Sequence, residues 1–326
     1  MDETLDTIVI GGSAGSLPAL KTILPQLDRN IPASIIICQH YPVIAETRVA
    51  DLLAPLSSLP VTVAQDGMPL EHGRVYFAAP DVHLMLGKSH IHLRRGAHEN
   101  RFRPAIDPLF RSAAVFRSTR VAGVILSGLL DDGAAGARAI ARTGGQIIVQ
   151  APETADFPDM PRAALRAVPG AKSVSVDDIA SCLTKLAGSP VPAAEPIPRD
   201  IGLEVKIAGL EDASMEKESE LGELSPYNCP DCNGVLWQIE DGPLTRFRCH
   251  TGHAYSMEAL SVSQDEALNS SLFKSLRAHK GRVELLQQMA RGTDNIKARD
   301  DYEKRAAQVQ IDAERIEQIL LQRRTS

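Results

Sequence analysis

Short apolar runs alternate with amphipathic segments over the first half of the chain. Strands are predicted at residues 7–10, 34–38, 61–64, 74–78, 91–93, 121–126 and 146–150. Helical periodicity is typical of residues 134–142 and 174–186. Because strands that alternate with helices pair in parallel and are covered on both faces, the pattern predicts an α/β fold with a doubly wound, mainly parallel sheet. The short pieces within residues 75–93 suggest an antiparallel hairpin at one edge.

The second half of the chain has a different pattern. Prolines interrupt the periodicity after residue 188, and residues 189–225 are rich in Glu and Lys, which predicts a linker. Beyond Ser256, apolar positions recur every three, four or seven residues, with a break at residues 292–294. This spacing predicts two helices, each burying one stripe. We expect these C-terminal helices to bind a regulatory partner or to form a homo-oligomer.

Length and charge limit the possible partners and location. With 326 residues, the chain is long enough for two or more domains. A net charge of −6 without a long basic run argues against nucleic acid or an anionic membrane as the main partner. No uninterrupted apolar stretch approaches the ~20 residues of a membrane span, and the N-terminus lacks the basic start of a signal peptide. We therefore expect a cytoplasmic protein without membrane insertion.

The turn at residues 11–15, Gly-Gly-Ser-Ala-Gly, lies between the first predicted strand and a helix-like segment. Small residues on both sides let the backbone bend sharply, so that the Ser13 hydroxyl can project above the carboxyl edge of the sheet. Helical N–H groups that follow such a turn could meet an oxyanion. Ser13 is therefore a candidate hydrolase nucleophile. The alternative is a glycine-rich turn that only lets helix and strand pack closely.

Two candidate partners for Ser13 follow other predicted strands. His40 comes directly after residues 34–38, and Asp131 and Asp132 follow residues 121–126. Singly, such a histidine is often structural, and such an aspartate often caps a helix. Together with Ser13, a base and a carboxylate at the same sheet edge would suffice for acyl transfer from an ester. The order Ser, His, Asp along the chain differs from the Ser, Asp or Glu, His order of α/β-hydrolases.

Several sequence blocks resemble CheB-type protein-glutamate methylesterases of bacterial chemoreceptor systems. The resemblance covers roughly residues 7–187, and its blocks lie at residues 11–15, 39–42, 76–84, 103–113, 131–136 and 159–162. It implies that Ser13 is the nucleophile and His40 the base. The family segment Gly-Met-Gly-Asn-Asp-Gly aligns with residues 128–133, which implies Asp132 as the triad carboxylate.

Three positions depart from that family segment. Asp131 stands where the family has Asn, Leu129 replaces the active-site Met, and Leu130 replaces a Gly. Asp131 could cap the helix or add negative charge beside the site, which would raise the proton affinity of a neighbouring carboxylate. The departures leave the three triad residues intact and concern the shape of the pocket and its oxyanion support.

The resemblance also implies a reaction. Family members hydrolyse γ-glutamyl methyl esters on methylated chemoreceptors and release methanol, and some deamidate glutamine; no cofactor is needed for catalysis. Chemotaxis members usually carry an N-terminal receiver domain, whereas this chain begins six residues before its first predicted strand, so we expect a receiver-less form. The alternative is a non-catalytic scaffold or partner-binding signalling protein that retains the fold.

A second candidate site lies in the C-terminal half. Cys229 and Cys232 form a Cys-x2-Cys turn, and Cys249 opens a second turn that contains His250 and His253. Cysteines clustered in this way in a cytoplasmic protein favour structural zinc over disulfides. Similarity to ribbons attached to receiver-less relatives implies the ligand set Cys229, Cys232, Cys249 and His253, with His250 as the alternative fourth ligand. A metal-free ribbon is the other alternative, and a four-ligand site leaves no position for catalysis.

These observations together predict the domain organisation. We expect a methylesterase catalytic domain at residues 1–188, a linker at 189–225, a zinc-ribbon-like module at 226–262 and C-terminal helices at 263–326.

Overall fold

The computed structural model describes residues 3–40, 48–210 and 221–323. Residues 41 and 42 of the 39–42 block and residues 211–220 of the predicted linker lie outside the described residues. The helices are α1 (Ser16–Ile23), α2 (Arg48–Leu53), α3 (Ile106–Arg117), α4 (Ala134–Arg142), α5 (Asp159–Ala167), α6 (Val176–Leu186), α7 (Arg199–Ala208), α9 (Met257–Arg291) and α10 (Ile296–Arg323). The strands are β1 (Thr7–Gly12), β2 (Ser34–Gln39), β3 (Val61–Val63), β4 (Val75–Phe77), β5 (His83–Leu86), β6 (Ile91–Arg94), β7 (Val121–Ile125), β8 (Gln146–Gln150), β9 (Lys172–Val174), β10 (Glu223–Asn228), β11 (Val235–Asp241), β12 (Leu244–Cys249) and β13 (Ala254–Ser256).

A seven-stranded sheet forms the centre of the first half of the chain. Its strand order is β3-β4-β2-β1-β7-β8-β9, and all of its neighbouring strands pair in parallel. The predicted doubly wound, mainly parallel α/β fold is thereby confirmed. The chain leaves β1 towards β2 on one side and later returns to its other side as β7. The carboxyl ends of β1, β2 and β7 are therefore neighbours, at the kind of switch point where ligands bind in open α/β sheets.

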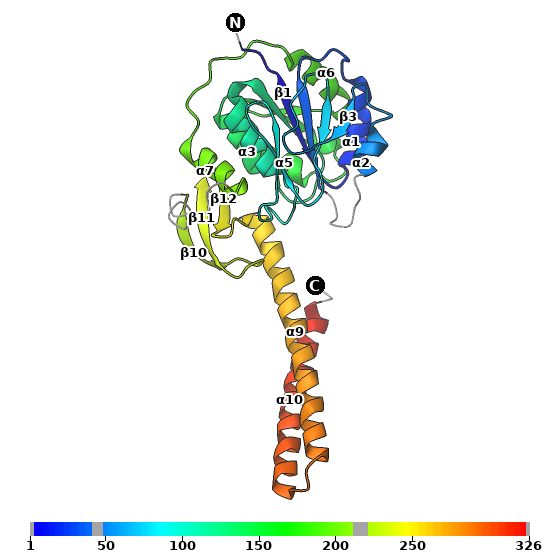
Figure 1. Cartoon of the computed structure of the whole chain (residues 1–326), viewed down its shortest axis with the longest axis vertical. Helices are drawn as coiled ribbons and strands as arrows, with labels where there is room; N and C mark the ends of the chain where they lie inside the picture. The colour runs from blue at the N-terminus through cyan, green and yellow to red at the C-terminus, as the bar shows by residue number, and fades with distance from the viewer. Residues whose placement is uncertain (1–2, 41–47, 211–220, 324–326) are drawn as a thin grey trace. The chain divides into compact units, whose positions relative to one another are not determined.

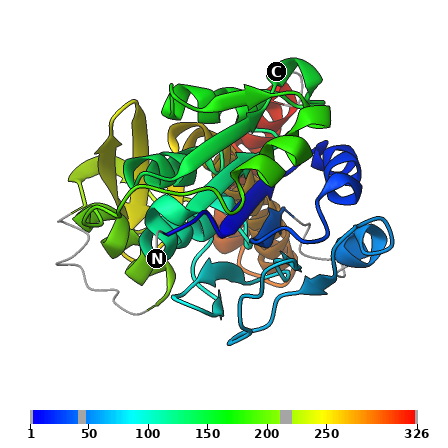
Figure 2. The same ribbon diagram turned by 90° about the horizontal axis from the view of Figure 1, so that it is seen from above.

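Helices cover both faces of this sheet (Figure 1). Successive strand residues point to opposite faces, so that Val9 faces the layer of α3, α4 and α5, whereas Ile8 and Ile10 face the layer of α1 and α6. Both faces are apolar, which is why the strands read as nearly continuous hydrophobic runs. Figure 2 shows the sheet between its helical layers from a second direction. The apolar clusters on the two faces of the sheet therefore fix the positions of the strand ends.

The edge of the sheet differs from the sequence-based expectation. β4 is not part of an antiparallel hairpin but lies inside the parallel sheet, between β3 and β2. The hairpin is formed by β5 and β6 alone, with Leu84 opposite Leu93. β9, which precedes α6, was not predicted because its sequence, Lys-Ser-Val, is mostly polar and exposed and gives no apolar run.

The range 189–225, interpreted as a linker, contains a packed helix. In α7, Glu204 and Ile207 are buried, and Val205 and Ala208 pack with Met85 in a small apolar cluster. Residues 1–260 form one compact unit and residues 261–326 a second. The ribbon module at 226–262 therefore belongs mostly to the unit that holds the parallel sheet. The composition of residues 189–225 did not indicate α7, because the partners that bury its apolar residues are distant in sequence.

Strands β10 to β13 form a separate antiparallel sheet, which we call the ribbon. Asp241 pairs with Leu244 across a tight turn, and Gly242 has a φ of 60°, as a two-residue hairpin with Gly first requires. In Figure 1, β11 and β12 lie beside α7. β11, which contains Trp237, and β12 therefore form a hairpin whose two-residue turn is Gly242 and Pro243.

Buried ion pairs join the ribbon to α7 and to the region around the parallel sheet. Arg246 of β12 donates to Glu204 at 2.7 Å, and Arg248 donates to Glu204 at 3.2 Å and to Glu99 at 3.0 Å. Arg111 of α3 also pairs with Glu99. All five side chains are buried, so each charge depends on the others for compensation. The ribbon is thus docked through a fixed charge arrangement.

The second unit is an antiparallel helical hairpin. Lys280 of α9 pairs with Glu317 of α10 at 3.0 Å, and Arg323 donates to Asn269 at 3.1 Å. Ala306, Ala313 and Leu320 supply the buried stripe of α10. The two helices predicted after residue 256 are confirmed. None of the described helices has the length and apolar character needed to span a membrane.

Candidate active site

Ser13 is held at a rigid elbow directly after β1. Its N–H donates to the Ser127 carbonyl at 3.0 Å, and its own carbonyl accepts the Ser16 hydroxyl at 2.6 Å and the Gln39 amide at 2.9 Å. Gly15 has a φ of 72°, a left-handed conformation that favours glycine. A side chain at Gly128 would collide with Ser13 and with Met160, so the elbow also needs glycine on the neighbouring loop. The backbone of Ser13 is therefore held by contacts from several elements rather than by its own loop alone.

His40 follows β2 and contacts both other predicted triad residues. Because Gly12 and Gln39 are partners in the β1–β2 register, the residues after them meet at the sheet edge. His40 Nδ1 lies 3.0 Å from Ser13 Oγ, and Nε2 lies 2.7 Å from Asp132 Oδ2. A carboxylate can only accept, so Nε2 carries the proton and Nδ1 is free to accept the serine proton. The ring stacks on Phe102, with centroids 3.7 Å apart.

Asp132 is buried in a nest of donors. Its oxygens accept the N–H groups of Ile106 at 2.7 Å and Gly133 at 3.0 Å, together with the Asn100 amide at 2.9 Å. Burial acts to raise the pKa of Asp132, but the hydrogen bond from His40 and these donors outweigh burial and hold the pKa below its usual value. Asp132 is therefore charged at neutral pH, as a group that stabilises an imidazolium must be.

A second buried carboxylate, Asp107, lies beside Asp132. It accepts the N–H of Gly136 at 2.6 Å and the Asn100 amide at 2.9 Å. Burial and the adjacent charge of Asp132 raise the pKa of Asp107 to about 7. Two carboxylates this close repel each other when both are ionised, so one of them tends to keep its proton. Asp132 keeps its charge because more donors face it.

Asp131 points away from the histidine. Its Oδ1 accepts the Ser256 hydroxyl of the ribbon at 2.6 Å. Leu130 stands where the family segment has Gly and has a φ of 61°, in the left-handed region. This conformation is strained for leucine but not for glycine, which explains the glycine of the family segment. Leu129 stands where that segment has Met and is 49% exposed. All three departures lie outside the hydrogen bonds of the triad.

Burial makes Asp131 a source of pH-dependent stability. Burial and the nearby carboxylates of Glu258 and Asp107 raise the pKa of Asp131 to about 7, although the Ser256 bond opposes the shift. Between about pH 4 and 7 the folded chain keeps a proton that the unfolded chain has released, so Asp131 costs stability as the pH rises. We expect the free energy of unfolding of Asp131→Asn, relative to that of the wild type, to rise by up to about 4 kcal/mol from pH 4 to pH 8, because the shift is about three pKa units. Urea unfolding of both proteins at pH 4 and pH 8 measures this change. A difference in unfolding free energy between variant and wild type that is the same at both pH values would contradict it.

Three site residues were not predicted from sequence. Asn100 and Asp107 surround the Asp132 carboxylate, and Phe102 supports the His40 ring. Asp107 lies inside a block that carried the family resemblance, but its chemistry gave no signal apart from its position near a helix start. Asn100 and Phe102 belong to an irregular loop, where neither periodicity nor strand-end placement identifies a role.

The sequence of the region that contains the parallel sheet matches a known protein family. A family profile described as CheB methylesterase matches residues 8–183, which is more than half of the chain. This chain belongs to the CheB methylesterase family. The match spans the parallel sheet and contains all three of Ser13, His40 and Asp132.

Relatives and a solved structure agree with this assignment. A Caulobacter vibrioides protein named protein-glutamate methylesterase/protein-glutamine glutaminase 2 is 38% identical over 168 residues, which are 50% of this chain and 48% of that protein. A Leptospira interrogans protein with a putative form of the same name is 35% identical, over 56% of this chain and 94% of its own length. The crystal structure of the Thermotoga maritima CheB methylesterase catalytic domain matches with a TM-score of 0.55 at 31% identity, over 57% of this chain and all of that domain. This chain therefore spans about half of the Caulobacter relative.

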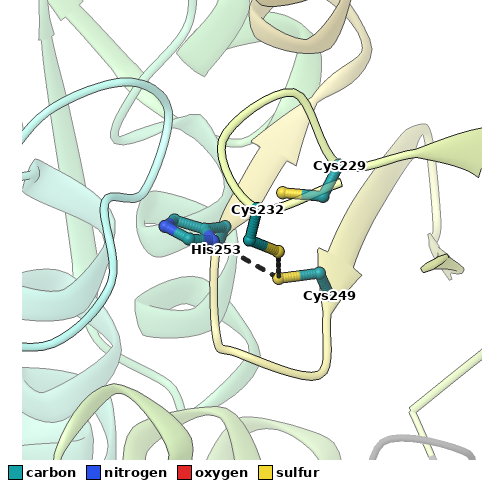
Figure 3. Close-up of side chains that lie close together, drawn as sticks. All are labelled: Cys229, Cys232, Cys249 and His253. Atoms are coloured by element: carbon teal, nitrogen blue, oxygen red, sulfur yellow. Dashed lines mark hydrogen bonds between the residues drawn. The ribbon is translucent and has the colours of Figure 1, made fainter. Parts of the chain in front are cut away.

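Outside the methylesterase region, the ribbon brings together the four predicted metal ligands (Figure 3). The ligand atoms of Cys229, Cys232, Cys249 and His253 all lie within 4.8 Å of one another. The two sulfurs of Cys232 and Cys249 are 3.6 Å apart, and His253 Nδ1 lies 3.4 Å from the Cys249 sulfur. Tetrahedral zinc with bonds of about 2.3 Å to sulfur requires roughly 3.7 Å between sulfurs, so the residues fit this ion. The alternative ligand His250 is not in this group.

The surroundings of the four ligands also suit a metal. Hydrogen bonds from Cys249, His253 and Tyr255 lower the pKa of the Cys229 thiol, despite its burial. Burial acts to lower the pKa of His253, but hydrogen bonds to Cys229 and Cys232 raise it to about 9. The other ring nitrogen of His253 lies 3.9 Å from Asp231, the kind of carboxylate that orients metal-bound imidazoles. The group thus favours a thiolate at Cys229, whereas the hydrogen bond to Cys229 and burial raise the pKa of the Cys249 thiol.

Proposed function

We propose that this chain is a serine esterase that hydrolyses γ-glutamyl methyl esters on methylated chemoreceptors or related signalling proteins. The observation that carries the proposal is the continuous pair of contacts from Ser13 through His40 to Asp132, at 3.0 and 2.7 Å. Membership of the CheB methylesterase family and relatives named protein-glutamate methylesterase support the substrate class. The proposed reaction consumes water and yields methanol and a glutamate carboxylate.

In the first half of the proposed reaction, Ser13 Oγ attacks the ester carbonyl while its proton passes to His40 Nδ1. Asp132 stabilises the resulting imidazolium through Nε2. The tetrahedral intermediate breaks its bond to the methoxy oxygen, which takes the proton from Nδ1 and leaves as methanol. The glutamyl group then remains esterified to Ser13.

In the second half, water attacks the acyl-serine ester and gives a proton to His40. The bond to Ser13 Oγ breaks, the serine regains its proton, and the glutamate carboxylate is released. These steps need no cofactor. The N–H groups of Ala14 and Gly15 follow Ser13 directly in the chain, precede α1 and make no hydrogen bond to another described residue, so they are candidates for binding the oxyanion.

Deamidation of glutamine would use the same groups. An amide nitrogen is a poorer leaving group than methoxide and needs more help from the His40 proton. We therefore propose the methyl ester as the main substrate and glutamine as a slower one. Relatives named protein-glutamine glutaminase support the inclusion of the second reaction.

The direct test is methanol release from a chemoreceptor methylated in vitro. We expect the purified chain to release methanol in proportion to the methyl groups lost from the receptor. Receptor that has not been methylated is the control for methanol from other sources. An inability to demethylate any receptor from the same cell would contradict the proposed substrate.

We propose that Cys229, Cys232, Cys249 and His253 hold a structural zinc ion. The ion would supply a tetrahedral crosslink between the two turns of the ribbon, and the four protein ligands would leave no position for substrate. We expect about one zinc per chain by elemental analysis, and its loss in the Cys229→Ser/Cys232→Ser double variant. Cys38→Ser/Cys182→Ser, which changes two cysteines outside the ribbon, should retain the metal. A fully folded wild type without metal would reject the site.

A further inference from the structure

One amide side chain connects the ribbon with the candidate triad. Asn100 Nδ2 donates to Asp132 at 2.9 Å and to Asp107 at 2.9 Å, so its two protons bridge the two buried carboxylates. Its Oδ1 accepts the backbone N–H of Ser256 at 2.9 Å. Because carboxylates accept and an N–H donates, this arrangement fixes which end of the amide faces the triad. Asn100 itself is buried.

The ribbon holds the backbone of the same loop. The Asn100 N–H donates to the Ala254 carbonyl at 2.8 Å, and the Ala254 N–H donates to the His98 carbonyl at 3.2 Å. Glu99 pairs with Arg248 of β12 at 3.0 Å. Three consecutive loop residues, 98–100, are therefore bound by β12 and β13. The loop then continues to Phe102, whose ring stacks on His40.

The conformation of this loop needs such support. Asn100 and Arg101 have φ values of 49° and 76°, in the left-handed region. Asn tolerates this region, whereas for Arg it costs on the order of 1 kcal/mol. Strained residues persist only where the surrounding structure fixes them. In this chain, the surrounding structure includes β13 of the ribbon.

We propose that Asn100 is a positioning residue for the triad and that the ribbon sets its orientation through the N–H of Ser256. The ribbon then influences turnover without contacting substrate. Loss of the Asn100 amide removes one hydrogen-bond donor from Asp132. It also removes the donor that lies between Asp132 and Asp107, so that the negative charge of one carboxylate disfavours that of the other more strongly. His40 is consequently less well held, and the attack by Ser13 slows. This inference rests on the proposed function of the triad.

The test measures how fast Ser13 reacts with diisopropyl fluorophosphate, which needs an activated serine but no receptor. The serine oxygen bonds to phosphorus, fluoride leaves, and the serine proton passes to His40. We expect Asn100→Asp, which keeps the side-chain shape and tolerates a positive φ, to slow phosphorylation of Ser13 by this reagent on the order of 10²-fold. On methylated receptor, kcat should fall similarly while KM stays within about twofold. Asn30→Asp makes the same change at an exposed position and should react like the wild type.

A second pair of variants tests the ribbon without changing Asn100. Ser256→Ala removes the hydroxyl but keeps the backbone N–H, whereas Ser256→Pro removes both. The difference between these two variants therefore isolates the N–H that Asn100 accepts. We expect Ser13 to be phosphorylated by the reagent at least about tenfold more slowly in Ser256→Pro than in Ser256→Ala, with both variants folded by circular dichroism. This pair decides the question if Asn100→Asp does not fold.

The outcomes separate this inference from the proposed function. Wild-type labelling of Ser13 without methanol release would reject the proposed substrate, while the labelling rates would still test the role of Asn100. Folded Asn100→Asp that labels at the wild-type rate would overturn the inference, as would equal rates for Ser256→Pro and Ser256→Ala. A wild type that does not label at Ser13 would overturn both.

Discussion

Replacing Ser13 by Ala is expected to lower methanol release from methylated receptor by at least about 10⁴-fold. The alanine lacks the atom that is placed to attack, since Ser13 Oγ lies 3.0 Å from His40 Nδ1. The elbow should keep its shape, because Ser13 is anchored by its backbone N–H and carbonyl rather than by its hydroxyl. Methanol release by purified wild type and Ser13→Ala measures the loss.

The matched control is Ser16→Ala. Ser16 is also at the elbow, but its hydroxyl donates to the Ser13 carbonyl and lies outside the His40 contact. We expect its loss of activity to be far smaller than that of Ser13→Ala. Equal methanol release by the wild type and Ser13→Ala would defeat the assignment of the nucleophile.

The second large effect is expected for Asp132→Asn, with a fall in kcat of about 10³- to 10⁴-fold. An amide cannot stabilise the imidazolium. Its NH2 group would face His40 Nε2 and the N–H of Ile106 at the Oδ2 position, or the Asn100 amide and the N–H of Gly133 at the Oδ1 position, and all of these groups donate. To avoid this, the imidazole would have to carry its proton on Nδ1, where it could no longer accept from Ser13. Steady-state kinetics on methylated receptor measures the loss.

Asp131→Asn is the neighbouring control for this change. Asp131 bonds Ser256 and makes no contact with His40, so we expect kcat to stay within about threefold of the wild-type value. The control changes charge in the same loop and thereby separates the triad role from a general electrostatic effect. Comparable losses in the two variants would contradict the assignment of Asp132.

The residues at strand ends could be predicted because their signals are local. Ser13 and His40 each follow an apolar run, and in a parallel sheet the carboxyl ends of such runs share one edge. The choice between Asp131 and Asp132 came from the family resemblance rather than from these signals. The structure shows how the two aspartates differ. Asp132 accepts the N–H of Ile106 in α3, whereas Asp131 accepts the hydroxyl of Ser256.

The features that were not predicted depend on contacts between distant parts of the chain. Glu204 appeared to belong to a polar linker, yet it is buried between Arg246 and Arg248. The sequence around Asn100 indicates only a loop, because its partners Asp132 and Ser256 are distant along the chain. Periodicity describes how one element buries its own face, so it contains no information about such long-range pairing.

The measurement that tests the central claim most directly compares His40→Ala, Asp132→Asn and their double variant by the rate at which diisopropyl fluorophosphate phosphorylates Ser13. If Asp132 acts only through His40, the double variant should react as slowly as His40→Ala and no more slowly, because residues that act as a unit are not additive. All three should still fold by circular dichroism. Losses that multiply in the double variant would mean that the two residues act independently and that the three groups are not a triad.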